Sequence, residues 1–90
     1  MYIKCEVVKQ DCSKLDYVNG CGYTHQYVEK ETIDTDALYI VGAVRVKDPV
    51  NGVYQYLCHW KNNPHRYPVI LNEKTWKKVM EIVTKDVVEI

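Results

Sequence analysis

The sequence predicts a single α+β domain, in which a small antiparallel β-meander of four to five strands carries one C-terminal helix on one face. Three observations predict it. Alternating and β-branched segments fill the first two thirds of the chain, Asn-Gly pairs separate them, and one apolar stripe with helical spacing follows. Ninety residues suffice for one hydrophobic core. We therefore expect residues 1–90 to form one domain.

The N-terminal part of the chain predicts a strand followed by a hairpin. Residues 2–9 alternate in polarity and predict the first strand, whereas the polar residues 10–14 predict a loop. Asn19 and Gly20 are the residue types that a type I′ turn requires at its two positive-φ positions. We therefore expect a tight hairpin whose second strand runs through residues 23–29.

The middle of the chain predicts a second hairpin. Polar residues 29–36 predict a connection, and residues 38–47, rich in Val and Ile, predict a strand in the centre of the sheet. Residues 48–52 contain the Pro and Gly of a turn, so residues 53–60 are predicted to return as the partner strand.

The C-terminal part of the chain predicts the helix. Residues 61–68 contain two prolines and form a loop, and Asn72 is a favourable N-cap residue. Trp76, Val79, Met80 and Val83 then fall on one helical stripe, which predicts a helix over about residues 72–84. We expect residues 86–90, which are short and β-branched, to form a terminal strand.

The second hairpin separates its side chains into two faces. One face collects the mainly aliphatic residues Leu38, Ile40, Val44, Val46, Val53, Leu57 and His59. The other collects Tyr39, Val41, Arg45, Lys47, Tyr54, Tyr56, Cys58 and Trp60. A single helix covers only one face. If it covers the aliphatic face, the aromatic face is left to bind a partner.

Aromatic residues beside Arg are typical of the residues that dominate protein interfaces. With the basic loop that follows, the candidate partner-binding residues are Tyr39, Arg45, Lys47, Tyr54, Tyr56, Trp60, His65 and Arg66. Two alternatives stay open. The N-terminal segment could fold over this face and make its aromatics a second, smaller core, and the basic loop could simply be solvated.

Cysteine and histidine residues supply the donors for a metal site or a nucleophile. Their spacing lacks the C-x-x-C pair of common zinc sites, and Cys58 and His59 point to opposite faces of a strand. We expect no metal, no cofactor and no enzymatic activity. A small enzyme or zinc-stabilised domain centred on Cys21, His25 or His65 is the remaining alternative.

These observations predict a non-catalytic protein-binding module. An inhibitor or adaptor fits this description, for example a small viral (phage) or mobile-element protein that blocks host defence machinery. Twelve basic and twelve acidic residues balance, which disfavours nucleic acid without excluding a single-strand binder that stacks bases on the sheet aromatics. The sequence opens without a signal-like leader, so we expect a cytoplasmic protein with reduced thiols. A homodimer through the second sheet face or an unpaired edge strand is compatible with each function.

Overall fold

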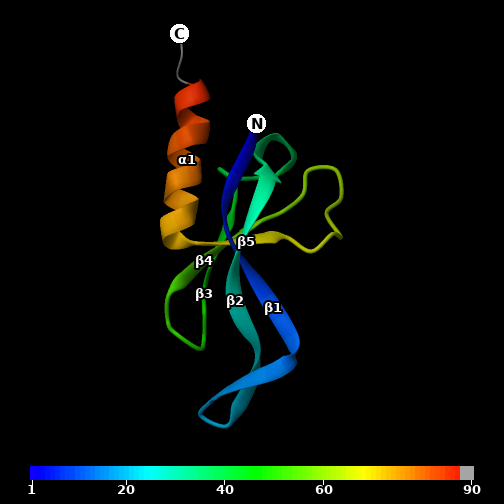
Figure 1. Ribbon diagram of the computed structural model, residues 1–90, viewed down its shortest axis with the longest axis vertical. Helices are drawn as coiled ribbons and strands as arrows, with labels where there is room; N and C mark the ends of the chain where they lie inside the picture. The colour runs from blue at the N-terminus through cyan, green and yellow to red at the C-terminus, as the bar shows by residue number, and fades with distance from the viewer. Residues whose placement is uncertain (88–90) are drawn as a thin grey trace.

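The computed structural model describes residues 1–87 and confirms the α+β fold (Figure 1). A five-stranded antiparallel sheet has the strand order β2-β1-β5-β4-β3, and one C-terminal helix packs on it. The elements are β1 (Tyr2–Val18), β2 (Cys21–Asp34), a 3₁₀ turn (Thr35–Ala37), β3 (Val44–Lys47), β4 (Tyr54–Cys58), β5 (Val69–Asn72) and α1 (Glu73–Val87). Strands β3, β4 and β5 form a meander, and β5 joins the β1–β2 hairpin through β1. The consecutive strands β2 and β3 therefore lie at opposite edges.

The β1–β2 hairpin is longer than the sequence predicts. Its turn is confirmed, because Asn19 and Gly20 have φ angles of 52° and 82°. Residues 10–14 do not form a loop, since β1 continues through them with a register shift between Asp11 and Leu15. The Asp11 carboxylate accepts hydrogen bonds from both the backbone N–H and the hydroxyl of Ser13, which satisfies polar groups locally within the bulge. The hairpin projects from a molecule 53 Å long (Figure 1).

The prediction of a central strand over residues 38–47 is wrong. Only Val44–Lys47 is a strand, and it lies at an edge of the sheet. Local hydrogen bonds from the Ile40 and Ala43 amides to the Leu38 and Ile40 carbonyls turn the preceding residues out of the ladder. Leu38 and Ile40 are nevertheless buried, so their apolar character reflects the core rather than the sheet. The central position belongs to β5, a short strand that the sequence pattern does not indicate.

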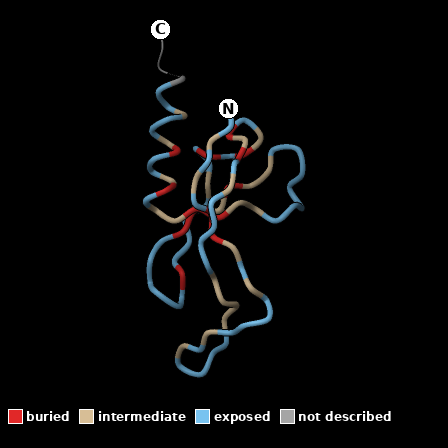
Figure 2. Tube along the Cα trace, in the orientation of Figure 1, coloured by how far each residue is buried: buried red, intermediate tan, exposed pale blue. Residues whose placement is uncertain are grey.

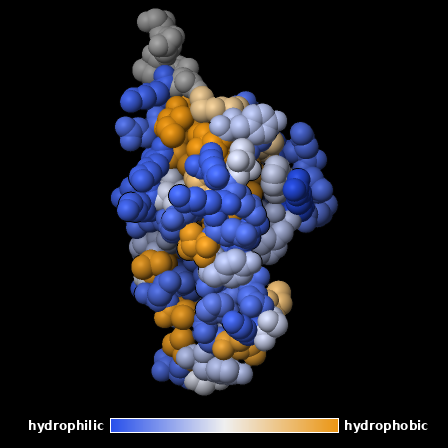
Figure 3. All heavy atoms as spheres, in the orientation of Figure 1, coloured by the Kyte–Doolittle hydropathy of each residue, from blue (hydrophilic) through white to orange (hydrophobic). Residues whose placement is uncertain are grey.

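Helix α1 begins where the sequence predicts. The Asn72 side-chain oxygen accepts a hydrogen bond of 2.9 Å from the Thr75 amide, which confirms the N-cap. The helix buries one side against the sheet, with Val79 fully buried, and its outer surface is hydrophilic (Figures 2 and 3). It continues to Val87, so the first two residues of the predicted strand over 86–90 are helical. The remainder of that predicted strand lies outside the described residues.

The helix covers the face that carries Tyr56 and Cys58. The Trp76 ring stacks on the Tyr56 ring with their centroids 4.0 Å apart, and the Trp76 indole N–H donates to the Ile40 carbonyl. The buried core beneath consists of Val7, Ile33, Leu38, Ile40, Cys58, Leu71 and Val79. The condition for a free aromatic face, that the helix covers Val44 and Leu57, is therefore not met, because Trp76 of the helix packs on the Tyr56 ring.

The opposite face carries a row of aliphatic side chains across all five strands. Each neighbouring pair in it is directly opposed in the sheet: Val28 with Val8, Val8 with Ile70, Ile70 with Leu57 and Leu57 with Val44. Val8 and Ile70, in the middle, are buried, whereas Val28 and Val44 at the two ends are exposed. We call these five residues the aliphatic row.

The sheet curls towards the aliphatic row. Gln55 of β4 donates a 2.7 Å side-chain hydrogen bond to Gln26 of β2. These strands are three places apart in the sheet order, which in a flat sheet would separate their backbones by about 14 Å. Only a strongly coiled sheet allows this contact.

Candidate protein-binding groove

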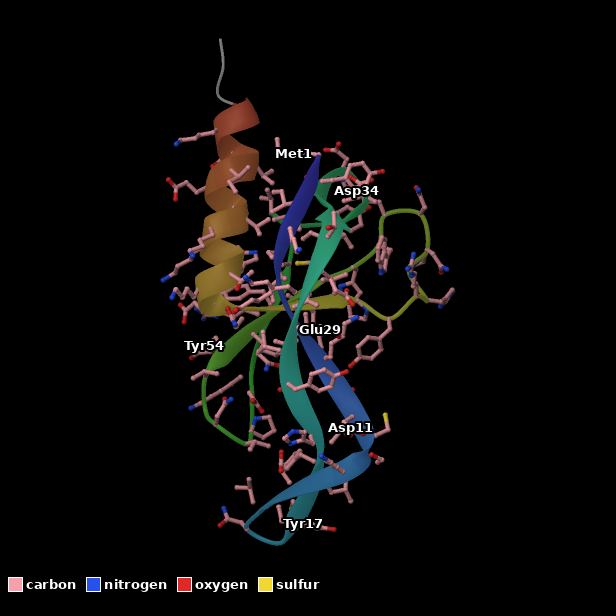
Figure 4. The ribbon with its side chains drawn as sticks, viewed as in Figure 1. Met1, Asp11, Tyr17, Glu29, Asp34 and Tyr54 are labelled. Atoms are coloured by element: carbon pink, nitrogen blue, oxygen red, sulfur yellow. The ribbon has the colours of Figure 1, made fainter. Side chains whose placement is uncertain are left out.

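The structure divides the predicted partner-binding residues into two groups. Arg45, Lys47 and Tyr54 lie on the β3–β4 hairpin, where the Arg45 guanidinium is 4.5 Å from the centre of the Tyr54 ring. Tyr54 is labelled in Figure 4. The other group, at the loop of residues 61–68 and the segment beside it, comprises Tyr39, Trp60, His65 and Arg66. Six residues of extended chain, or about 20 Å, separate Tyr54 from Trp60. The aromatic face is therefore not one continuous surface.

Tyr56 belongs to neither group. Its exposed fraction is only 6%, because the Trp76 ring covers it. Strand alternation correctly placed Tyr56 with Tyr54 and Arg45, but it could not show that the helix packs on that side. Tyr56 is a core residue in this structure and is not available to a partner.

The backbone on either side of Trp60 is held firmly. Trp60 forms an isolated antiparallel bridge with Leu38. The Tyr39 amide donates to the His59 carbonyl at 2.9 Å, and the Lys61 amide donates to the Ala37 carbonyl at 3.0 Å. The backbone from which the Trp60 side chain projects is therefore fixed in position.

The loop of residues 61–68 turns back over Trp60. The Asn63 side-chain oxygen accepts from the His65 amide, and the Asn63 carbonyl accepts from the Arg66 amide, each at 3.2 Å. The Trp60 indole N–H donates to the Tyr67 carbonyl at 3.0 Å. These bonds place the Arg66 guanidinium 3.8 Å from the centre of the Trp60 ring, within the range of a cation–π contact.

A groove of about 470 Å³ lies between this loop and β1. Its apolar lining is formed by Val8, Pro68, Val69 and Ile70. The Cys12 side chain and the ion pair of Lys9 with Glu31 also line it. On the side of the loop, the lining is completed by Trp60, Arg66 and Tyr67. We call it the Trp60 groove.

Proline chemistry explains why the Trp60 groove opens at this place. Val8 pairs with Ile70, so continuation of the ladder would bring Gln10 opposite Pro68. Pro68 has no N–H to donate, and the β1–β5 pairing stops there. The two prolines of residues 61–68 predicted the loop, but nothing in the sequence indicated that β1 would form the other wall.

The cysteine and histidine residues are dispersed. The Cys5, Cys12, Cys21 and Cys58 thiols are free, and His25 Nδ1 lies 3.0 Å from an Asp16 carboxylate oxygen. Burial, with a smaller effect from Cys5, raises the pKa of Cys58 to about 12. Within residues 1–87, no group of three or more His, Cys, Asp or Glu side chains is placed to hold a metal ion.

Comparison with known proteins adds no functional information. No protein-family model matches the chain, and neither a curated protein nor a solved structure matches it. Among the residues that the structure describes, no helix is long and apolar enough to cross a membrane.

Proposed function

We propose that this protein is a non-catalytic binding module that holds a segment of a partner protein in the Trp60 groove. The observation that supports this proposal is the Arg66 guanidinium stacked on the Trp60 ring beside an apolar groove. An inhibitor or adaptor that occupies the surface of a larger protein would act in this way.

The composition of the groove suits a protein interface. Trp, Tyr and Arg are the residue types that most often dominate binding energy, and all three meet here. Tyr67 is 62% exposed and offers its ring to a partner. The Trp60 indole N–H is already bonded to the Tyr67 carbonyl, so burial of the ring leaves no unsatisfied donor.

The groove is also pre-organised. Backbone hydrogen bonds hold residues 59–61 against residues 37–39, and the Asn63 turn positions Arg66. A partner therefore meets side chains that are already in place, and binding loses little conformational entropy.

The charges of the groove indicate which segment would fit. Lys9 is neutralised by Glu31, whereas Arg66 forms no ion pair with any of the described residues. A segment that places an apolar side chain in the groove and a carboxylate against Arg66 would match both its lining and its charge.

Affinity capture tests this proposal. The tagged protein, its Arg66→Glu variant and a Tyr17→Ser control would be used to capture partners from a lysate of the native source, with and without nuclease. Tyr17 lies at the far end of the β1–β2 hairpin (Figure 4) and is exposed, so its replacement leaves the groove intact. We expect a stoichiometric protein that survives nuclease, is retained by the control and is reduced at least tenfold by Arg66→Glu.

Two results would contradict the proposal. Equal capture by Arg66→Glu and wild type would show that the groove is not the binding surface. Capture that disappears with nuclease would favour single-stranded nucleic acid instead, with Trp60 stacking on a base.

A further inference from the structure

Strand β2 presents a long unpaired edge. It runs from Cys21 to Asp34, a length of 14 residues, and pairs with β1 on one side only. The other edge strand, β3, has four residues. Unpaired edges are templates for pairing with another chain, and proteins commonly blunt them with proline, bulges or charge.

Strand β2 has little of this protection. It contains no proline, and the register shift of the hairpin lies between residues 11 and 15 of β1. Its only lysine, Lys30, stands between Glu29 and Glu31, so these three side chains leave a net charge of only −1. Val28 is 51% exposed at this edge.

Charge favours β2 over β3 as a self-pairing edge. In an antiparallel pair with a two-fold axis perpendicular to the sheet, residues that point to the same face oppose each other. Two β3 strands paired about Arg45, Val46 or Lys47 would oppose Arg45 or Lys47 to a like charge, and like charges directly opposite are destabilising. Two β2 strands avoid this repulsion when the axis passes through Gln26, Tyr27 or Val28, but not when it passes through Glu29 or Lys30.

The aliphatic row distinguishes Val28 from Gln26 and Tyr27. The row crosses all five strands and ends at Val28, on the free edge of β2. An axis through Val28 opposes it to the same residue of the second copy, so the row continues without interruption into the second sheet. The same register opposes Thr24 to Thr32, which is a favourable cross-strand pair, and it places no like charges opposite each other.

We propose that two copies of this chain form a two-fold symmetric dimer through antiparallel pairing of their β2 strands, centred on Val28. The result is a continuous ten-stranded sheet. This interface uses the free edge of β2, whereas the proposed partner segment contacts β1 and the loop of residues 61–68; Glu31 borders both surfaces.

Sedimentation equilibrium over a range of protein concentrations tests the interface. We expect a reversible monomer–dimer equilibrium for the wild type. Val28→Lys would oppose two lysines at the axis and weaken dimerisation at least tenfold. Val46→Lys, the same kind of change at the exposed edge strand β3, should leave dimerisation unchanged, and circular dichroism would show that both variants are folded. A wild type that stays monomeric, equal effects of both variants, or growth beyond the dimer would overturn the proposal.

Disulfide trapping tests the register. In a Cys12→Ser, Cys21→Ser background, Val28→Cys should form an interchain disulfide readily, because directly opposed residues lie within bonding reach. Tyr27→Cys, which this register opposes to Glu29, should do so at least tenfold more slowly. Faster bonding through Tyr27→Cys would overturn the Val28-centred register.

Discussion

The Trp76 ring lies parallel on the Tyr56 ring, with 4.0 Å between the centroids and 2° between the planes. This contact joins α1 to β4 on the face of the sheet that forms the core. Because it buries Tyr56, the other aromatic residues predicted to bind a partner are separated, with Tyr54 on the β3–β4 hairpin and Tyr39 and Trp60 beside the loop of residues 61–68.

The first prediction concerns this stacked pair. Trp76→Ala should lower the free energy of unfolding by about 3 kcal/mol, because a large aromatic contact in the core is lost. Tyr54→Ser, two residues from Tyr56 on the same face but exposed, should cost under about 1 kcal/mol. Urea unfolding followed by circular dichroism measures both. Equal effects would show that the stack does not organise the core.

The second prediction concerns the hydrogen bond between Gln26 and Gln55. Gln55 is buried, so Gln26→Ala would leave its amide without a partner and cost about 1–3 kcal/mol. Replacing both residues by Leu should lower the free energy of unfolding by less than the sum of the losses from the two single Leu replacements, as expected for coupled partners. A double-mutant cycle by urea unfolding measures this coupling; strictly additive effects would argue against the curled sheet.

The third prediction concerns thiol reactivity. Cys12 and Cys21 are exposed and should react with iodoacetamide in the folded protein, whereas Cys58 is fully buried and should react only after unfolding. Cys5, whose pKa burial raises, should react more slowly than the exposed pair. Mass spectrometry of alkylated peptides gives the order, and early modification of Cys58 would contradict the packing.

The fourth prediction concerns alkaline pH. The pKa of Cys58 is raised from 9.0 to about 12 in the folded protein, so the folded state retains a proton that the unfolded state loses. The resulting stability is complete below pH 9 and is lost as the pH rises from 9 towards 12. Between pH 9 and 10 the wild type should lose on the order of 1 kcal/mol more than Cys58→Ala does. Denaturant titrations of both proteins measure this difference, and parallel pH curves would contradict it.

Local chemistry was predicted well from the sequence. The Asn19–Gly20 turn and the Asn72 cap depend on a few neighbouring residues, so the residue types suffice to predict them. The strand predicted at residues 38–43 does not form, and the strand at residues 69–72 was not predicted. The apolar, β-branched residues of segment 38–43 indicate that the segment is buried. A turn beneath the helix can bury such residues as well as a central strand can.

The candidate site was predicted only in part. Trp60 and Arg66 were identified by their residue types, but their contact depends on the Asn63 turn. Whether the helix packs on Tyr56 or on Leu57 depends on how its side chains fit against each face of the sheet. The alternation of residues along a strand does not predict which face the helix covers. The wall that β1 contributes to the groove depends on pairing between segments about sixty residues apart.

Hydrogen exchange on the complex tests the central claim most directly. The captured partner would be purified, and amide exchange of this protein would be compared in the free and bound states. If the Trp60 groove holds the partner, added protection should concentrate in residues 7–12 and 60–70 and be absent from residues 44–54 of the β3–β4 hairpin. Protection confined to the β3–β4 hairpin, with unchanged exchange around Trp60 and Arg66, would contradict the assignment of the groove as the binding surface.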